Sequence, residues 1–150
     1  MITPSLVISS DHAGFERKEW LKQFLAEHGY QVEDLGPTVE QPEDDYPGYG
    51  FALGERVVKD VSRGVLVCGN GQGICIAANK VAGVRAVSAF TPEMAVSTRN
   101  DDDANVLCVP ARFQTNEEIG AVVLAWLETP FSDEERHRRR IRQLADQEGW

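Results

Sequence analysis

Residues 65–80 read Val-Leu-Val-Cys-Gly-Asn-Gly-Gln-Gly-Ile-Cys-Ile-Ala-Ala-Asn-Lys, and this stretch decides how the rest of the chain is interpreted. It begins with an apolar run typical of a buried strand, passes through three glycines at alternate positions, and ends in a run typical of a helix. A glycine-rich turn between a strand and a helix leaves backbone N–H groups free to face an anion. Cys68, at the end of the strand, therefore lies where a negative charge is stabilised, either on its own sulfur or on a bound substrate.

Two plainer features of this stretch limit the interpretation. Free cysteine is among the most often buried residue types, so Cys68 also fits an inert core position. Gly69, Gly71 and Gly73 form G-x-G-x-G, without the G-x-G-x-x-G spacing of dinucleotide-binding turns. The stretch therefore predicts an anion-stabilising turn and no dinucleotide cofactor.

Length and charge restrict the class of protein. The 150 residues, 42% of them apolar, fit a single domain over residues 1–150 with a real core. The formal charge of -9 argues against binding to nucleic acid or to an anionic membrane surface, because the phosphates would be repelled. No apolar run approaches the roughly 20 residues of a membrane span, and the N-terminus lacks the basic region of a signal peptide. We expect a cytoplasmic protein.

The cysteines indicate neither a disulfide framework nor a zinc site. Cys68, Cys75 and Cys108 are odd in number, lie in apolar runs and show no C-x-x-C spacing.

Short apolar runs alternate with longer helical patterns along the chain, which is typical of a parallel sheet covered by helices. The runs expected to be strands are 6–9, 31–35, 65–68, 85–90 and 106–110. Helical spacing predicts helices over 15–28, ended by Gly29, and over 116–128. Capping boxes are predicted at Thr115 with Glu118 and at Ser132 with Glu135, the second opening a C-terminal helix through about residue 147.

Polar residues follow several of these strands. In open parallel sheets, ligands bind beyond the carboxyl ends of the strands. Asp11 and His12 follow the first strand, and Cys68 and its glycine turn follow the third. A third cluster, Arg99 to Asn105, precedes the last strand. We expect the three clusters to converge on one edge, although each has a plainer reading as a helix cap, a surface histidine or a solvated acidic loop.

At this point the chain closely resembles the ribose-5-phosphate isomerase B family, which includes the galactose-6-phosphate isomerase subunits. The resemblance covers nearly the whole length, and its motifs occur in order: Ser10-Asp-His-Ala-Gly14, Asp45-Tyr-Pro47, Cys68-Gly-x-Gly-x-Gly73, Ile76-Ala-Ala-Asn-Lys80, Gly83-Val-Arg85, Asn105-Val-Leu107 and Arg136-His-x-x-Arg140. It implies a three-layer, Rossmann-like α/β sandwich with a mainly parallel five-stranded sheet and helices on both faces. It also implies a homodimer or dimer of dimers, with sites at the subunit interface and the C-terminal helix (about 132–148) packing there, and no metal or organic cofactor.

The reaction implied by the resemblance is an aldose–ketose isomerisation of a small sugar phosphate, ribose 5-phosphate to ribulose 5-phosphate, through a cis-enediolate. Cys68 matches the base, and the amides from Gly69 to Gly73, including Asn70 and Gly71, would hold the enediolate oxygen. Asp11 matches a residue that contacts sugar hydroxyls and assists their proton transfers. Positions of the phosphate site are matched by His12, Arg112, Arg136 and Arg140.

For two of these arginines, a role in phosphate binding is also supported by their spacing, independently of the resemblance. Arg136 and Arg140 lie one helical turn apart and can face the same phosphate. The plainer reading is a solvated or nucleic-acid-binding face of an amphipathic helix, and the acidic composition disfavours the nucleic acid.

Three positions depart from the family pattern. Asp101 stands where many members have the histidine that helps to open the furanose ring, Asp102 stands at a neighbouring asparagine position, and Asn70 stands where threonine or serine is common. Either Asp101 takes over the proton transfer of ring opening, or the substrate is a tetrose or tetrulose 4-phosphate that forms no such ring, or it is another sugar such as a hexose 6-phosphate. A catalytically silent sugar-phosphate-binding protein is a further alternative, and a divalent metal on the acidic run is only weakly indicated.

Overall fold

The computed structural model describes residues 5–60 and 62–149. Within them lies a sheet of five strands in the order β2-β1-β3-β5-β4, in which every neighbouring pair is parallel. The strands are β1 (Leu6–Ser10), β2 (Val32–Asp34), β3 (Arg63–Cys68), β4 (Ala86–Ser88) and β5 (Val106–Pro110). The helices are a 3₁₀ turn, η1 (His12–Gly14), then α1 (Phe15–Glu27), α2 (Pro47–Asp60), α3 (Gly73–Asn79), α4 (Pro92–Asp102), α5 (Asn116–Glu128) and α6 (Glu135–Glu148).

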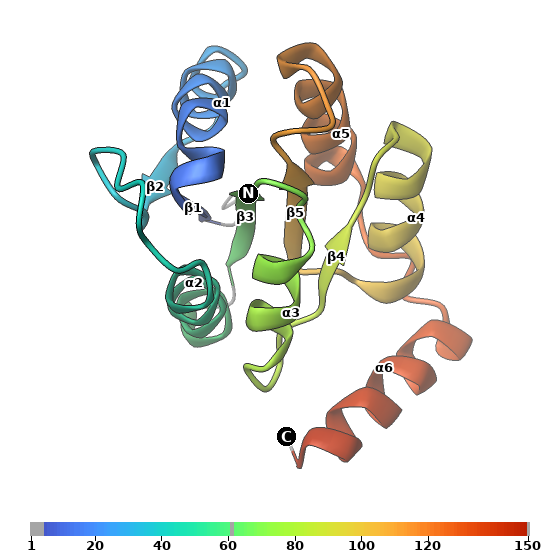
Figure 1. The fold of residues 1–150 in the computed structure, drawn as a ribbon. Helices are drawn as coiled ribbons and strands as arrows, with labels where there is room; N and C mark the ends of the chain where they lie inside the picture. Colours follow the sequence, from blue (N-terminus) through green and yellow to red (C-terminus); the bar gives the residue numbers. More distant parts are fainter. Residues whose placement is uncertain (1–4, 61, 150) are drawn as a thin grey trace.

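Helices cover both faces of the sheet, so the predicted three-layer α/β fold is confirmed (Figure 1). Alternate residues of each central strand enter different apolar clusters, as the strand periodicity requires. In β3, for example, Val65 and Val67 pack with α1, α4 and α5, whereas Leu66 and Cys68 pack with α2 and α3. Because both faces are buried, the central strands read as continuous apolar runs.

The predicted elements are found within a few residues of their expected bounds. The run 106–110 is a strand over its full predicted length, whereas the strand expected over 85–90 is limited to Ala86–Ser88. The helix expected over 15–28 ends one residue earlier, beside Gly29 at φ 87°. The Thr115 hydroxyl accepts a hydrogen bond from the Glu118 amide at 3.2 Å, so this half of the predicted capping box is confirmed.

The capping box predicted at Ser132 and Glu135 is wrong. The N-cap of α6 is Glu134, and its side chain makes no capping hydrogen bond. The Ser132 hydroxyl instead lies 2.6 Å from Nδ1 of the buried His137 and accepts from the Glu134 amide at 3.3 Å. The Ser132 hydroxyl thus contacts the His137 side chain instead of capping the helix, and α6 begins after Glu134.

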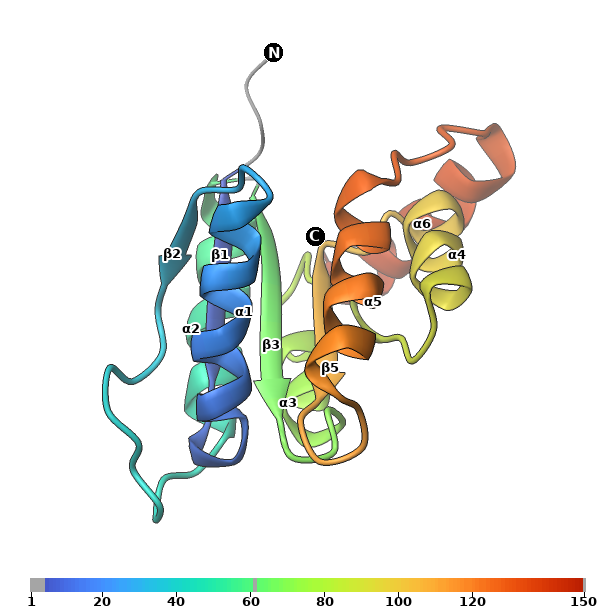
Figure 2. The same ribbon diagram turned by 90° about the horizontal axis from the view of Figure 1, so that it is seen from above.

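Helix α6 is attached differently from the other helices. It lies beside α4, outside the layers that cover the sheet, and near its C-terminal end the Glu148 carboxylate accepts from the Gly83 amide at 2.6 Å (Figure 1). Figure 2 shows it on the side of the molecule away from the arrowheads of β3 and β5. Across 5–60 and 62–149, no helix has the length and apolar character needed to cross a bilayer.

Candidate active site

The ends of β1 and β3 form the centre of the candidate site. These strands are neighbours in the sheet. The helices that follow them, α1 and α3, pack on opposite faces of the sheet. In open parallel sheets, ligands bind beyond the strand ends at the point where the connections change face in this way. Asp11 follows β1, is buried, and accepts a hydrogen bond from the Gly14 amide at 3.1 Å. Cys68 ends β3 and is only 5% exposed.

A close backbone contact holds these two strand ends together. A Cβ atom at Gly14 would lie 2.2 Å from the carbonyl oxygen of Val67 and 2.9 Å from the amide nitrogen of Cys68. No side chain larger than hydrogen fits there, so the Asp11–Gly14 turn rests directly on the β3 backbone. Asp11 and Cys68 therefore lie at one place in the fold, as predicted.

The glycine turn after Cys68 is shaped by its glycines and by neighbouring side chains. Gly71 has φ 74°, a conformation that favours glycine. The Asn70 side chain accepts from the Gln72 amide at 2.9 Å, and the Ser88 hydroxyl donates to the Gly71 carbonyl at 3.2 Å. At Gly73, the first residue of α3, a Cβ would lie 2.6 Å from Cζ of Tyr46, so the tyrosine ring covers this glycine.

The segment after β5 joins the same turn. The Cys68 carbonyl accepts from the Ala111 amide at 2.8 Å, and the Gly69 carbonyl accepts from the Arg112 amide at 2.9 Å. The exposed Arg112 folds over Gly69, with guanidinium atoms 3.0 Å from where a Cβ would stand. The structure therefore brings Arg112, which the resemblance assigns to the phosphate site, to the turn.

His12 is held by Asp44, a residue that the sequence analysis did not identify as a candidate. Oδ1 of Asp44 lies 2.7 Å from Nδ1 of His12 and accepts from the His12 amide at 3.1 Å. This hydrogen bond, more than the nearby charge of Asp11, raises the pKa of His12 above its ordinary value. Burial raises the pKa of Asp44, but its contacts with His12 and Tyr49 outweigh burial and leave it lowered.

A groove of about 440 Å³ opens beside His12. Arg17 spans part of it, donating to the Asn116 side chain at 2.6 Å and to the Ala111 carbonyl at 3.3 Å. The groove is lined by His12, Ala13, Glu16, Arg17, Glu40, Ala111 and Asn116. It therefore presents one imidazole and one guanidinium beside two carboxylates.

The expectation that the Arg99–Asn105 cluster converges on this edge is wrong for a single chain. Asp101 and Asp102 form the end of α4 and precede β5, so they lie at the amino-terminal edge of the sheet, opposite Cys68. The side-chain Nδ2 of Asn100 donates to the Asp101 carboxylate at 2.7 Å, and this hydrogen bond lowers the pKa of Asp101. Nε2 of His137 lies 3.8 Å from the same carboxylate.

The arginines of α6 are likewise on the far side from Cys68. Arg136 and Arg140 are exposed on the helix that extends beyond α4 (Figure 2). Arg136 donates to Glu134 on the same segment at 2.8 Å. Within one chain, therefore, Asp11, His12, Arg112 and the turn from Cys68 to Gly73 are brought together, but Asp101, Asp102, Arg136 and Arg140 are not.

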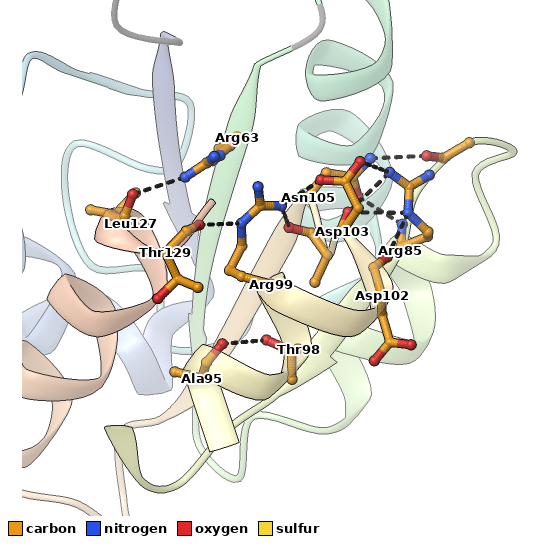
Figure 3. A network of polar contacts seen from close by, with 12 residues as sticks. Arg63, Arg85, Ala95, Thr98, Arg99, Asp102, Asp103, Asn105, Leu127 and Thr129 are labelled. Carbon is orange, nitrogen blue, oxygen red and sulfur yellow. Dashed lines mark hydrogen bonds and ion pairs between the residues drawn. The ribbon is translucent and has the colours of Figure 1, made fainter. Parts of the chain in front are cut away.

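A dense polar network occupies the amino-terminal edge (Figure 3). Arg99, only 4% exposed, donates to the Asp103 carboxylate and to the Ala104 and Thr129 carbonyls at 2.7–3.2 Å. Arg85 donates to the Asp102 and Asp103 carbonyls from the other side at 3.0–3.1 Å. Asp103 adopts φ 46° at the helix end, a left-handed conformation that these contacts hold in place.

Cys75 and Cys108 lie in the same apolar cluster as Cys68, and all three are buried and free. Contact with the Cys108 thiol lowers the pKa of Cys75, whereas burial raises the pKa of Cys108 well above its ordinary value. In the described part of the chain, no three His, Cys, Asp or Glu side chains are grouped as ligands for a metal ion.

Known proteins share this sequence and architecture. A family model described as Ribose/Galactose Isomerase matches residues 6–144. Probable ribose-5-phosphate isomerase B of Mycoplasma genitalium is 40% identical over 139 residues, covering 91% of each chain. Ribose-5-phosphate isomerase B of Mycobacterium tuberculosis is 37% identical over 142 residues, covering 94% of this chain and 88% of the relative.

Solved structures agree with the sequence relatives. The crystal structure of ribose-5-phosphate isomerase B from Mycoplasma genitalium with bound ribulose-5-phosphate superposes with a TM-score of 0.94 at 36% identity, covering 99% of each chain. That of the Thermotoga maritima enzyme gives 0.91 at 38% identity, covering 97% of this chain and 99% of the other. The chain therefore belongs to the Ribose/Galactose Isomerase family, and the isomerase expected from its motifs is confirmed.

Proposed function

We propose that the protein interconverts ribose 5-phosphate and ribulose 5-phosphate through a cis-enediolate, with Cys68 as the base. The observation that carries this proposal is the meeting of Cys68, Asp11 and the glycine turn at the β1/β3 edge. Relatives that match nearly the whole chain are named for this activity, and one was solved with ribulose-5-phosphate bound.

In the proposed reaction, the Cys68 thiolate takes the proton from C2 of the open-chain aldose. The C–H electron pair forms the C1–C2 double bond, and the carbonyl π electrons move to O1, where turn amides between Gly69 and Gly73 stabilise the oxyanion. Asp11 transfers the O2 proton to O1, and the Cys68 thiol returns its proton to C1. The product is the ketose, with both side chains back in their starting protonation states.

The phosphate requires positive charge from two chains in this proposal. His12 and Arg112 lie beside the glycine turn of one chain. Arg136 and Arg140 lie at the opposite edge of the sheet, on the helix that extends from the body. A homodimer that brings α6 and the end of α4 of one protomer to the Cys68 turn of its partner would complete the site. Asp101 would then face the sugar from the second protomer.

One observation favours a second substrate. Asp101 occupies the position of the family's ring-opening histidine, and its hydrogen bond from Asn100 lowers its pKa. A carboxylate made more acidic is a weaker base toward the anomeric hydroxyl. A four-carbon sugar 4-phosphate, which forms no furanose ring, would not need this step.

The test is proton NMR of ribose 5-phosphate, and separately of erythrose 4-phosphate, incubated with the protein in heavy water. We expect ribulose 5-phosphate to form, with solvent deuterium at the transferred position. Conversion of the four-carbon sugar alone would establish the second substrate. Absence of reaction with both sugars would contradict the proposed function.

A further inference from the structure

Asp44 and His12 form a contact between segments far apart in the sequence. One carboxylate oxygen of Asp44 accepts from both the ring Nδ1, at 2.7 Å, and the backbone amide of His12, at 3.1 Å, across 32 residues. The Asp44 side chain is 8% exposed, whereas that of His12 is 33% exposed. The carboxylate is therefore an internal anchor, and the imidazole is the accessible member of the pair.

The contact fixes which nitrogen of His12 can meet a ligand. A carboxylate accepts hydrogen bonds, so Nδ1 carries a proton in this geometry. Nε2 is then the ring atom available to a bound molecule. In the neutral imidazole Nε2 has a lone pair and repels a phosphate oxygen, whereas in the imidazolium it donates a hydrogen bond. The protonation state of His12 thus decides between attraction and repulsion.

The charges around His12 come from several elements. Asp11 and Asp44 favour the imidazolium, and Arg112 opposes it. The groove beside the ring adds the charges of Glu16, Glu40 and Arg17. Tyr49 of α2 also contacts Asp44, and its pKa is raised first by burial and then by this contact. Without a charged His12, the groups that one chain places around a phosphate at this edge would be four carboxylates and two guanidinium groups.

We propose that Asp44 is a positioning residue that holds His12 as an imidazolium, with Nε2–H directed at the phosphate of the substrate. This inference rests on the proposed function, because it takes the ligand at this edge to be a sugar phosphate. Nothing in the sequence pattern marks Asp44, since its role depends on the fold bringing the 35–46 segment back to the end of β1.

The test compares Asp44→Asn with wild type over pH 5.5 to 8.5. Asparagine keeps an oxygen that accepts from Nδ1 but removes the charge that favours the imidazolium. We expect KM for ribose 5-phosphate to be about tenfold higher at pH 7.5, the size of one charge-assisted hydrogen bond, with kcat within about twofold. As the pH falls toward 5.5 and His12 takes up a proton in the variant as well, the two KM values should converge.

Inorganic phosphate provides a probe of the same contact without turnover. Its inhibition constant, or its dissociation constant by direct titration, should rise in Asp44→Asn by the same factor as KM and with the same pH dependence. Glu43→Gln, which removes an exposed carboxylate one residue away, is the matched control and should leave both constants unchanged.

An NMR titration of the imidazoles gives a readout that a merely structural role would not move. The chain has three histidines, and the His12 resonance is the one lost in His12→Gln. Its midpoint should fall in Asp44→Asn and stay in place in Glu43→Gln. In the His12→Gln background, Asp44→Asn should have no further effect on phosphate binding.

The outcomes separate this inference from the proposed function. If wild type fails to isomerise ribose 5-phosphate, the proposed function falls, while phosphate binding and the His12 titration still decide the role of Asp44. An Asp44→Asn protein with wild-type phosphate binding across the pH range would overturn the inference. So would a loss confined to kcat, or a loss of phosphate binding that persists in the His12→Gln background.

Discussion

The two edges of the sheet are built in contrasting ways. At the amino-terminal edge, Arg99 and Arg85 are satisfied by a carboxylate and several carbonyls, and little of Arg99 reaches solvent (Figure 3). At the carboxyl-terminal edge, Arg112 is exposed over a glycine turn, and His12 is partly exposed while its anchor Asp44 is nearly covered. Arg99 and Arg85 thus hold the chain, whereas Arg112 and His12 are left for a ligand.

This difference shows that residue type alone does not distinguish scaffold from site. Arginine and aspartate occur at both edges, and the number of partners that each side chain has within the chain separates them. A charge already satisfied internally stabilises the fold, whereas an accessible charge held by one internal contact is prepared for a substrate. Substitutions of internally satisfied and of accessible charges should therefore affect different measurements, stability for the first and activity for the second.

The largest effect is expected for Cys68→Ala at the carboxyl-terminal edge. Loss of the base should lower kcat for ribose 5-phosphate by about 10³-fold, with the unfolding curve nearly unchanged. The matched control is Cys75→Ala, which removes a buried thiol from the same apolar cluster and should keep activity within a few-fold. Equal losses in the two variants would mean that packing, and not proton transfer, explains the effect.

Arg99→Met should produce the opposite result, with a large loss of stability. It leaves the Ala104 and Thr129 carbonyls and one side of Asp103 without their donor, and we expect the free energy of unfolding to fall by about 3 kcal/mol in urea. The exposed Arg139→Met is the control and should change it by less than about 0.5 kcal/mol. A stable Arg99→Met protein would show that Arg85 alone supports this edge.

A third variant tests whether α6 contributes to the site. Arg140→Gln should raise KM about tenfold, because one charge-assisted contact to the phosphate is lost, while unfolding stays unchanged. Arg139→Gln removes the same charge from the adjacent exposed position and should leave KM within about twofold. If both variants raise KM equally, the helix acts through its overall field and not through a specific contact.

The smallest effect is expected at Thr115, the N-cap of α5. Thr115→Ala should cost about 1 kcal/mol of stability, because the Glu118 amide loses its cap, and kcat should not change. Thr115→Ser keeps a hydroxyl and should recover most of the loss. A change in kcat would show that α5 influences the Arg112 segment.

Local signals in the sequence predicted most of the fold and which candidate residues meet at the ends of β1 and β3. Strand β5 and the Thr115 cap follow from hydrophobic pattern and capping chemistry within a few residues. The capping box predicted at Ser132 was wrong because the serine hydroxyl contacts His137, a partner that the capping pattern does not consider. The predicted convergence of Asp101 with Cys68 was wrong within one chain. A residue that precedes a parallel strand lies at the opposite edge of the sheet from a residue that follows one.

Contacts between segments far apart in the sequence could not be predicted from hydrophobic periodicity or capping patterns. The position of Asp44 depends on a chain reversal of 32 residues, and no periodicity predicts where such a segment returns. Tyr46 lies in a motif that the family resemblance includes, but its place over Gly73 is seen only once α2 and α3 are packed together.

The backbone contact at Gly14 bears on how the substrate preference of such an enzyme can be redesigned. Variant libraries at Asn70, where the side chain is exposed, or at Asp101 sample new chemistry on an intact scaffold. A library that includes position 14 would instead lose most of its members, since any side chain there pushes against the main chain of β3. New specificity at this edge therefore has to be sought around a fixed glycine, with Asp11 and Cys68 kept at their present separation.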